Sequence, residues 1–146
     1  GNIIPNIGGE EQKISQEIVK ILGQAHESAT FETTVHVHRV PVVHGHTIAA
    51  HVFFEDKVAI KDVLTAFNEA ARKNANAYKI YDDEFSPQPA RDLSHNDMRT
   101  HIGRIKQGGS PNVIGLVALG HNLVRGAAGA AMRNLEAAIS YMKANP

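Results

Sequence analysis

The stretch TFETTVHVHRVPVVHGHTIAAHVFFE, residues 30–55, contains two segments rich in β-branched and aromatic residues on either side of PVVHG. That composition is typical of strands, whereas Pro41 and Gly45 favour a break in the regular structure between them. The sequence therefore predicts two strands, over residues 30–40 and 46–55, joined through PVVHG.

The segments around this pair predict further helices and strands. Residues 9–23 place isoleucine and leucine at helical spacing after glutamates in the first turn and before a terminal glycine, which predicts an amphipathic helix. The other elements expected from the pattern are a helix over residues 58–73, strands over 78–82, 101–106 and 112–120, and a polar connection over 82–98.

The last segment, residues 122–143, is expected to form a helix of unusual composition. Alanine or a larger apolar residue occupies most of its circumference, whereas a surface helix carries one apolar stripe. The helix is therefore expected either to be central to the domain or to pack against something outside this sequence.

Length, charge and composition exclude several classes of protein. At 146 residues the chain is long enough for one domain with a hydrophobic core. Its 15 basic and 15 acidic residues cancel, so no basic field attracts nucleic acid or an anionic membrane. No apolar run approaches the roughly 20 residues of a membrane span, and no secretory signal is visible, so a cytoplasmic location is expected. With no cysteine, the chain has no disulfide, thiolate metal ligand or thiol nucleophile.

Four histidines lie within residues 35–47, and three interpretations remain open. Alternate residues of a strand share a face, so His36, His38 and His44 are candidate zinc ligands, with His46 on the same side. The same histidines are also typical of partly exposed strand positions with no shared function. In the third interpretation, a chain reversal between Arg39 and His46 brings a carboxylate-binding guanidinium near a proton-transferring imidazole. Without a reversal those residues would lie about 23 Å apart.

One of these segments resembles a known family. RVPVVHGHT, residues 39–47, is similar to the signature of aspartate-semialdehyde dehydrogenases, in which a histidine follows an arginine by seven residues. Residues 2–23, NIIPNIGGEEQKISQEIVKILG, and residues 117–139, VALGHNLVRGAAGAAMRNLEAAI, resemble the same family. The segments IPNIGGEE and GHN-x-x-RGAAGA are most similar to its archaeal and fungal branch.

The resemblance implies a fold and an activity. The fold is an α+β domain like the C-terminal domain of glyceraldehyde-3-phosphate-dehydrogenase-like enzymes. In it, a mixed or mostly antiparallel sheet carries helices on one face and forms a homodimer through the other. The activity is the NADPH-dependent reductive dephosphorylation of β-aspartyl phosphate to aspartate β-semialdehyde, a step toward lysine, diaminopimelate, threonine, methionine and isoleucine. In this family a cysteine thiolate attacks the acyl phosphate before hydride transfer.

The resemblance also implies roles for particular residues. Arg39 corresponds to the arginine that holds the substrate carboxylate, a task suited to its planar fork. His46 corresponds to the acid/base histidine beside the cysteine, and its ordinary pKa near neutrality suits that role. The remaining implied contacts are Glu17 with the substrate, Lys20 with its phosphate, and Asn122 and Leu123 with the nicotinamide. Without the family, Glu17 and Lys20 are typical of a solvated helix face, whereas the helix start at Asn122 predicts free backbone N–H groups.

The resemblance covers only the C-terminal part of the sequences of this family. The glycine-rich Rossmann fingerprint and the cysteine motif of the family would precede Asn2. We therefore expect residues 1–146 to be a C-terminal catalytic and dimerisation domain that is inactive alone. Its last helix, residues 122–143, would then pack against an N-terminal domain that provides most of the NADP contacts.

Three alternatives remain. N-acetyl-γ-glutamyl-phosphate reductase shares the chemistry and overall plan of the aspartate enzyme. The chain is also compatible with a non-enzymatic dimerisation module, or with a metal site at the histidines, although no metal is expected.

Overall fold

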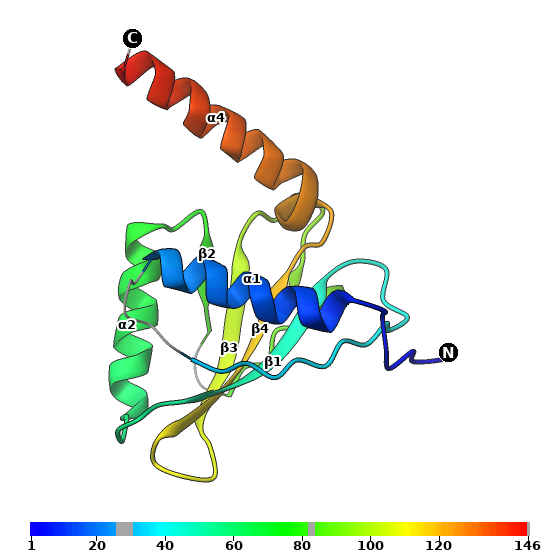
Figure 1. Cartoon of the computed structure of the whole chain (residues 1–146), viewed down its shortest axis with the longest axis vertical. Helices are drawn as coiled ribbons and strands as arrows, with labels where there is room; N and C mark the ends of the chain where they lie inside the picture. The colour runs from blue at the N-terminus through cyan, green and yellow to red at the C-terminus, as the bar shows by residue number, and fades with distance from the viewer. Residues whose placement is uncertain (26–30, 82–83, 146) are drawn as a thin grey trace. The chain divides into compact units, whose positions relative to one another are not determined.

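A computed structural model describes residues 1–25, 31–81 and 84–145 of the chain (Figure 1). The chain forms two compact units, Gly1–Pro41 and Val42–Pro146. The first contains one helix and an extended segment, and the second contains the sheet.

The second unit is built on a four-stranded sheet with the order β1-β4-β3-β2. Its strands are β1 (His46–Phe53), β2 (Tyr78–Ile80), β3 (Thr100–Gln107) and β4 (Val113–Gly120). β4 is antiparallel to both β1 and β3, whereas β2 and β3 are parallel. The expected α+β fold with a mixed, mostly antiparallel sheet is confirmed, as are the strands predicted within residues 46–55, 78–82, 101–106 and 112–120. Asp82 lies outside the described residues.

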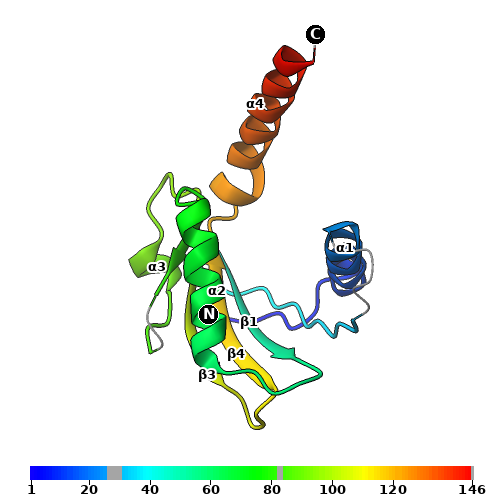
Figure 2. The same ribbon diagram turned by 90° about the vertical axis from the view of Figure 1, so that its left-hand side faces the viewer.

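Helix α2 (Ile60–Lys73) covers one face of this sheet and runs beside β2 (Figures 1 and 2). It begins with Asp62 in its first turn and ends with Arg72 and Lys73, charges that match the two ends of the helix dipole. The core beneath it consists of Ile102, Ile105 and Ile114, against which the half-buried Val63, Leu64 and Phe67 of α2 pack. The predicted helix over residues 58–73 is therefore confirmed.

The connection before β3 lies against the opposite face of the sheet. It includes the short helix α3 (Pro89–Asp92). The backbone N–H of Arg104 donates to the carbonyl of Phe85 at 2.7 Å. At this point the register with β4 shifts between Gly103 and Lys106, and Arg104 takes a positive φ of 50°, which marks a bulge.

In the first unit, helix α1 (Glu10–Ala25) confirms the helix predicted over residues 9–23. Gly23 was expected to end the helix, but it lies inside it. Ile14 and Ile18 are half-buried, whereas Ile21 is 64% exposed, so the buried stripe is shorter than the sequence predicts.

The strand predicted over residues 30–40 is wrong for residues 31–40, and Thr30 lies outside the described residues. Burial alternates as in a strand, with residues 31, 33, 35 and 37 half-buried and the residues between them exposed. In the described part of the chain, however, the only bridge in this segment joins Arg39 to Ile4. The N–H of Val37 instead donates to the Glu11 carboxylate at 2.9 Å. The β-branched and aromatic composition of this segment is compatible with an extended backbone, but a strand also needs a neighbouring strand.

The last segment is helical, as predicted, but it does not form one uniform helix. A π-helical turn, η1 (Val124–Ala128), precedes α4 (Gly129–Ala144). In this turn Gly126 and Ala128 donate to carbonyls five residues earlier, on His121 and Leu123. Residues 131–145 are all exposed, and the large apolar side chains among them are Met132, Leu135, Ile139, Tyr141 and Met142. Among the described residues, no helix is both long and apolar enough to cross a membrane.

We predict that Gly103→Ala destabilises the protein, because the added methyl group would collide with the Phe85 carbonyl oxygen and press on Pro87 and Tyr81. Overpacking of this kind costs about 1–3 kcal/mol in unfolding free energy, measurable by urea denaturation. The matched control is Gly109→Ala, where nothing lies within 4 Å of the added atom. Equal stabilities for the two variants would contradict the close packing at Gly103.

Candidate active site

The pairing of β1 with β4 brings two of the three family-like segments together. His46 begins β1 and lies opposite Gly120, the last residue of β4. The residues that precede His46 therefore lie next to those that follow Gly120. HGH, residues 44–46, therefore lies next to HN, residues 121–122, although 77 positions separate Gly45 from Asn122.

Gly45 is held tightly in this arrangement. Its N–H donates to the side-chain Oδ1 of Asn122 at 2.9 Å. Its φ of +108° is unfavourable for any residue with a side chain. A Cβ at this position would lie 2.8 Å from Leu93 Cδ1 and 3.2 Å from Pro89 Cβ. Only glycine fits before His46, whose own side chain is exposed.

Two histidine rings stack beside this contact. The rings of His44 and His121 are 5.0 Å apart and inclined by 26°. His121 is buried, and its Nδ1 accepts the backbone N–H groups of Leu123 and Val124, each at 3.3 Å. These N–H groups were expected to be free at the helix start, but the His121 ring satisfies them instead. The buried Nδ1 of His44 has no hydrogen-bond partner among the described residues.

In the first unit, the backbone fixes Arg39 while its side chain stays accessible. Arg39 and Ile4 exchange two backbone hydrogen bonds of 2.9 and 3.0 Å. The Arg39 side chain is 65% exposed, and its Nη2 lies 4.0 Å from Glu10 Oε1. This loose ion pair leaves the planar fork available for a carboxylate. Arg39 and His46 belong to different units, so their predicted convergence stays a prediction.

Glu17 and Lys20 are both exposed on α1. Glu17 Oε1 lies 3.7 Å from Lys13 Nζ, the i, i+4 pair expected on a solvated helix face. Their roles toward substrate and phosphate stay predictions, as do those of Asn122 and Leu123 toward the nicotinamide.

The interpretation of His36, His38 and His44 as zinc ligands gains no support from the described residues. Across residues 1–25, 31–81 and 84–145, no group of three or more histidine or acidic side chains could hold a metal ion. His36 Nδ1 lies 3.8 Å from Glu11 Oε1, a single histidine–carboxylate pair in which Glu11 is half-buried.

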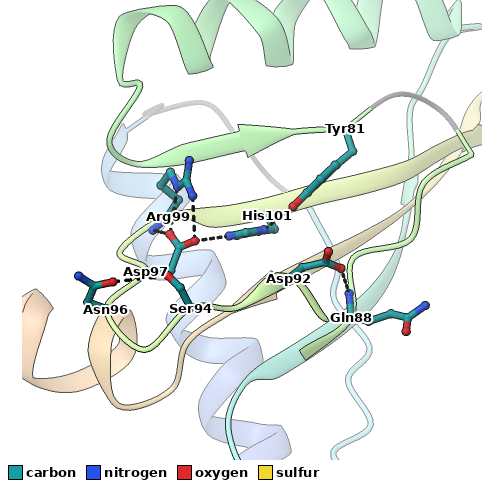
Figure 3. Close-up of polar contacts among 8 residues, drawn as sticks. All are labelled: Tyr81, Gln88, Asp92, Ser94, Asn96, Asp97, Arg99 and His101. Atoms are coloured by element: carbon teal, nitrogen blue, oxygen red, sulfur yellow. Dashed lines mark hydrogen bonds and ion pairs between the residues drawn. The ribbon is translucent and has the colours of Figure 1, made fainter. Parts of the chain in front are cut away.

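Sequence reasoning missed a buried polar network at the start of β3 (Figure 3). Arg99 donates from Nε and Nη2 to the two carboxylate oxygens of Asp97, at 3.0 and 2.9 Å. His101, fully buried, lies with Nε2 2.9 Å from Asp97 Oδ2 and Nδ1 2.8 Å from the Tyr81 hydroxyl. Its signal was the alternation of Asp97, Arg99 and His101, which the polar character of the preceding connection concealed.

Electrostatics in this network favour the ionised carboxylate. The hydrogen bonds from Arg99 hold the pKa of Asp97 well below its ordinary value, with a smaller contribution from His101, although burial opposes the shift. The same hydrogen bonds raise the pKa of Arg99. The network therefore anchors the end of the 84–98 connection to β3.

Comparisons with known proteins match almost the whole chain. A family described as "Semialdehyde dehydrogenase, dimerisation domain" matches residues 1–125. The curated aspartate-semialdehyde dehydrogenase of Methanothermobacter thermautotrophicus is 37% identical over 150 residues, covering 92% of this chain and 43% of that protein. The Archaeoglobus fulgidus enzyme is 35% identical over 145 residues, covering 92% and 42%. The chain thus spans less than half the length of these relatives.

Solved structures agree with the observed fold. Aspartate semialdehyde dehydrogenase II from Vibrio cholerae superposes with a TM-score of 0.79 at 22% identity, covering 95% of this chain and 41% of that chain. At this identity the likeness concerns the fold alone. The Candida albicans aspartate semialdehyde dehydrogenase with NADP gives a TM-score of 0.69 at 29% identity, covering 90% and 42%.

The Asp97 network predicts a loss of stability in acid. Because folding lowers the pKa of Asp97, its stabilisation is present above the ordinary carboxyl pKa of about 4 and is lost as pH falls toward the folded value. Asp97→Asn should lower stability at pH 7 and flatten the acid limb of unfolding free energy against pH. Some acid sensitivity should remain, because the Arg91 hydrogen bonds also lower the pKa of Asp92.

Urea denaturation between pH 7 and 3 measures this effect, with the exposed Asp56→Asn as control. If Asp97→Asn retains the full acid dependence of the unmodified chain, the network does not hold the carboxylate as described.

Proposed function

The chain belongs to the semialdehyde dehydrogenase dimerisation-domain family, and from this we propose that it is the C-terminal catalytic and dimerisation domain of an aspartate-semialdehyde dehydrogenase. The observation that carries the proposal is the meeting of HGH and HN across β1 and β4, which fixes His46 at the edge of the sheet. The share of each relative that is matched, 42–43%, is consistent with one domain of a longer enzyme.

The proposed reaction is the NADPH-dependent reductive dephosphorylation of β-aspartyl phosphate to aspartate β-semialdehyde. This reaction needs a thiolate nucleophile, and these 146 residues contain no cysteine. A part of the enzyme outside this sequence would therefore supply the thiolate, so this chain alone should be inactive. Its own residues would bind the substrate and transfer protons.

Four side chains of this chain have proposed roles toward the substrate. Arg39 holds the substrate carboxylate through its exposed guanidinium. His46 accepts the thiol proton and handles the proton of the tetrahedral intermediate. Glu17 contacts the substrate, and Lys20 contacts its phosphate. The exposure of Glu17 and Lys20 in the described unit is compatible with these contacts.

The hydride of the proposed reaction would come from NADPH, bound mainly by another domain. Asn122 and Leu123 are the residues of this chain that we propose to lie near the nicotinamide. Leu123 is 55% exposed. The Oδ1 of Asn122 is engaged by Gly45, which leaves its side-chain NH₂ as a donor toward a carboxamide carbonyl. The Asn122 side-chain NH₂ is therefore a chemically suitable donor for a contact with the nicotinamide.

The exposed apolar residues of α4 suggest a further role. Residues 131–145 are exposed around the whole helix, and apolar side chains of this number are unfavourable in water. We propose that this helix packs against the N-terminal Rossmann domain of the parent enzyme.

The first test is enzymatic. The full-length enzyme that includes this chain should oxidise NADPH with β-aspartyl phosphate and not with N-acetyl-γ-glutamyl phosphate, while residues 1–146 alone should be silent. His46→Asn should lower kcat about 10²–10⁴-fold, the usual contribution of general acid–base catalysis. Arg39→Ala should lower kcat/KM about 10–100-fold, since hydrogen bonds to charged groups contribute about 1.5–3 kcal/mol.

The matched control is His38→Asn, which changes an exposed histidine of the same segment and should leave kcat within about twofold. A preference for the N-acetylated substrate would replace the proposal with its nearest alternative. Activity of residues 1–146 alone would overturn the assignment of the nucleophile.

The second test concerns the homodimer, which we propose to form through the sheet face opposite α2. Phe53 lies on that face and is 74% exposed, whereas Ile48, on the same strand, lies on the α2 face and is 58% exposed. Phe53→Glu should dissociate the dimer, because a buried unpaired carboxylate is costly. Ile48→Glu is the matched control and should leave it intact.

Light scattering coupled to size-exclusion chromatography measures the mass of each variant. Dissociation by Ile48→Glu together with an intact Phe53→Glu dimer would assign the interface to the other face.

A further inference from the structure

We infer that Asn122 is a positioning residue that orients His46 through the backbone of Gly45. The inference rests on the proposed function, because that function makes His46 the proton-transferring group. It adds a second task for the Asn122 side chain, separate from any contact with the nicotinamide.

Two backbone attachments hold the chain at and just before His46. On one side, the β1–β4 ladder places His46 opposite Gly120. On the other side, the N–H of Gly45 donates to Asn122 Oδ1 at 2.9 Å. Because the backbone is held immediately before and at His46, the direction in which its imidazole leaves the chain is restricted.

The side chains of Leu93 and Pro89 pack against the Cα of Gly45. Leu93 and Pro89 lie so near that a Cβ at this position would be 2.8 Å from Leu93 Cδ1. With a φ of +108°, Gly45 is in a conformation that glycine adopts readily and a residue with a Cβ does not. Asn122 provides the only polar contact that the described residues make with the Gly45 N–H.

Asn122 is itself held in place by the residues on either side of it. His121 is 4% exposed and stacks on His44 at 5.0 Å. Its Nδ1 accepts the N–H groups of Leu123 and Val124, so the backbone around Asn122 has a fixed course. The amide oxygen is therefore presented to Gly45 at a fixed point.

The chemistry of this contact requires an acceptor at the Oδ1 position. Alanine removes the acceptor, whereas aspartate keeps an oxygen at the same place but loses the NH₂ donor. These two substitutions therefore distinguish the two possible tasks of Asn122, which are to accept the Gly45 N–H and to donate to the cofactor. A variant that restores the acceptor should restore the orientation of His46, and a variant that lacks only the donor should affect a cofactor contact alone.

The test compares Asn122→Ala with Asn122→Asp in the full-length enzyme that contains this chain. Asn122→Ala should lower kcat about 10–100-fold, because a displacement of about 1 Å can cost about 10²-fold in rate. Asn122→Asp should recover most of kcat while its KM for NADPH rises. The exchange rate of the Gly45 amide, followed by NMR, should increase in Asn122→Ala and return toward the original value in Asn122→Asp.

Asn112→Ala is the matched control. The Asn112 Nδ2 donates to the Phe54 carbonyl at 2.8 Å, so this variant also removes an asparagine–backbone bond, at the opposite end of the β1–β4 pair. It should lower stability without changing kcat. If it lowers kcat as much as Asn122→Ala does, the effect is general strand stability and the inference is overturned.

The remaining outcomes separate the inference from the proposed function. An active enzyme in which Asn122→Ala changes only the KM for NADPH overturns positioning and leaves the proposed function standing. An enzyme inactive on β-aspartyl phosphate, in which Gly45 exchange still depends on Asn122, overturns the proposed function and with it the catalytic purpose of the contact.

Discussion

The antiparallel pairing of β1 with β4 is the constraint on which the described site depends. Placing His46 opposite Gly120 carries Gly45 to Asn122 and His44 to His121. A shift of one residue in this register would turn the side chains of β1 to the other face and break these contacts. Ile114 of β4 is buried in the core against which α2 packs, and Leu116 and Ala118 pack partly buried against the same core, so this packing holds the register on which the site geometry depends.

A second chain of contacts reaches Gly45 from the opposite face of the sheet. The ionised Asp97, held by Arg99 and His101, anchors the connection that also carries Pro89 and Leu93. A buried carboxylate is costly unless it is paired and hydrogen-bonded, and here each of its oxygens has a donor. The network therefore stabilises the packing that closes on Gly45, although none of its members has a proposed role in the reaction.

Much of the fold was predictable because the helices and most strands leave a periodic signal. The helices over residues 9–23 and 58–73 followed from apolar spacing, and the strands that form the sheet followed from their composition. Residues 31–40 show the limit of this reasoning. Their composition is typical of a strand, but the Val37 N–H donates to the Glu11 carboxylate, and one bridge, from Arg39 to Ile4, is formed in this described segment. The Asp97 network was missed because the alternation of Asp97, Arg99 and His101 begins within a polar connection, where a buried carboxylate was not expected.

By itself the sequence determined the kind of domain and the residues to which the family chemistry points, Arg39 and His46 above all. These follow from local order along the chain, which short motifs and periodicity record directly. Only the tertiary structure decided that Asn122 accepts the Gly45 N–H and that His121 stacks on His44. Such contacts join residues far apart in sequence, and their geometry is set by strand register and core packing, which no local pattern encodes.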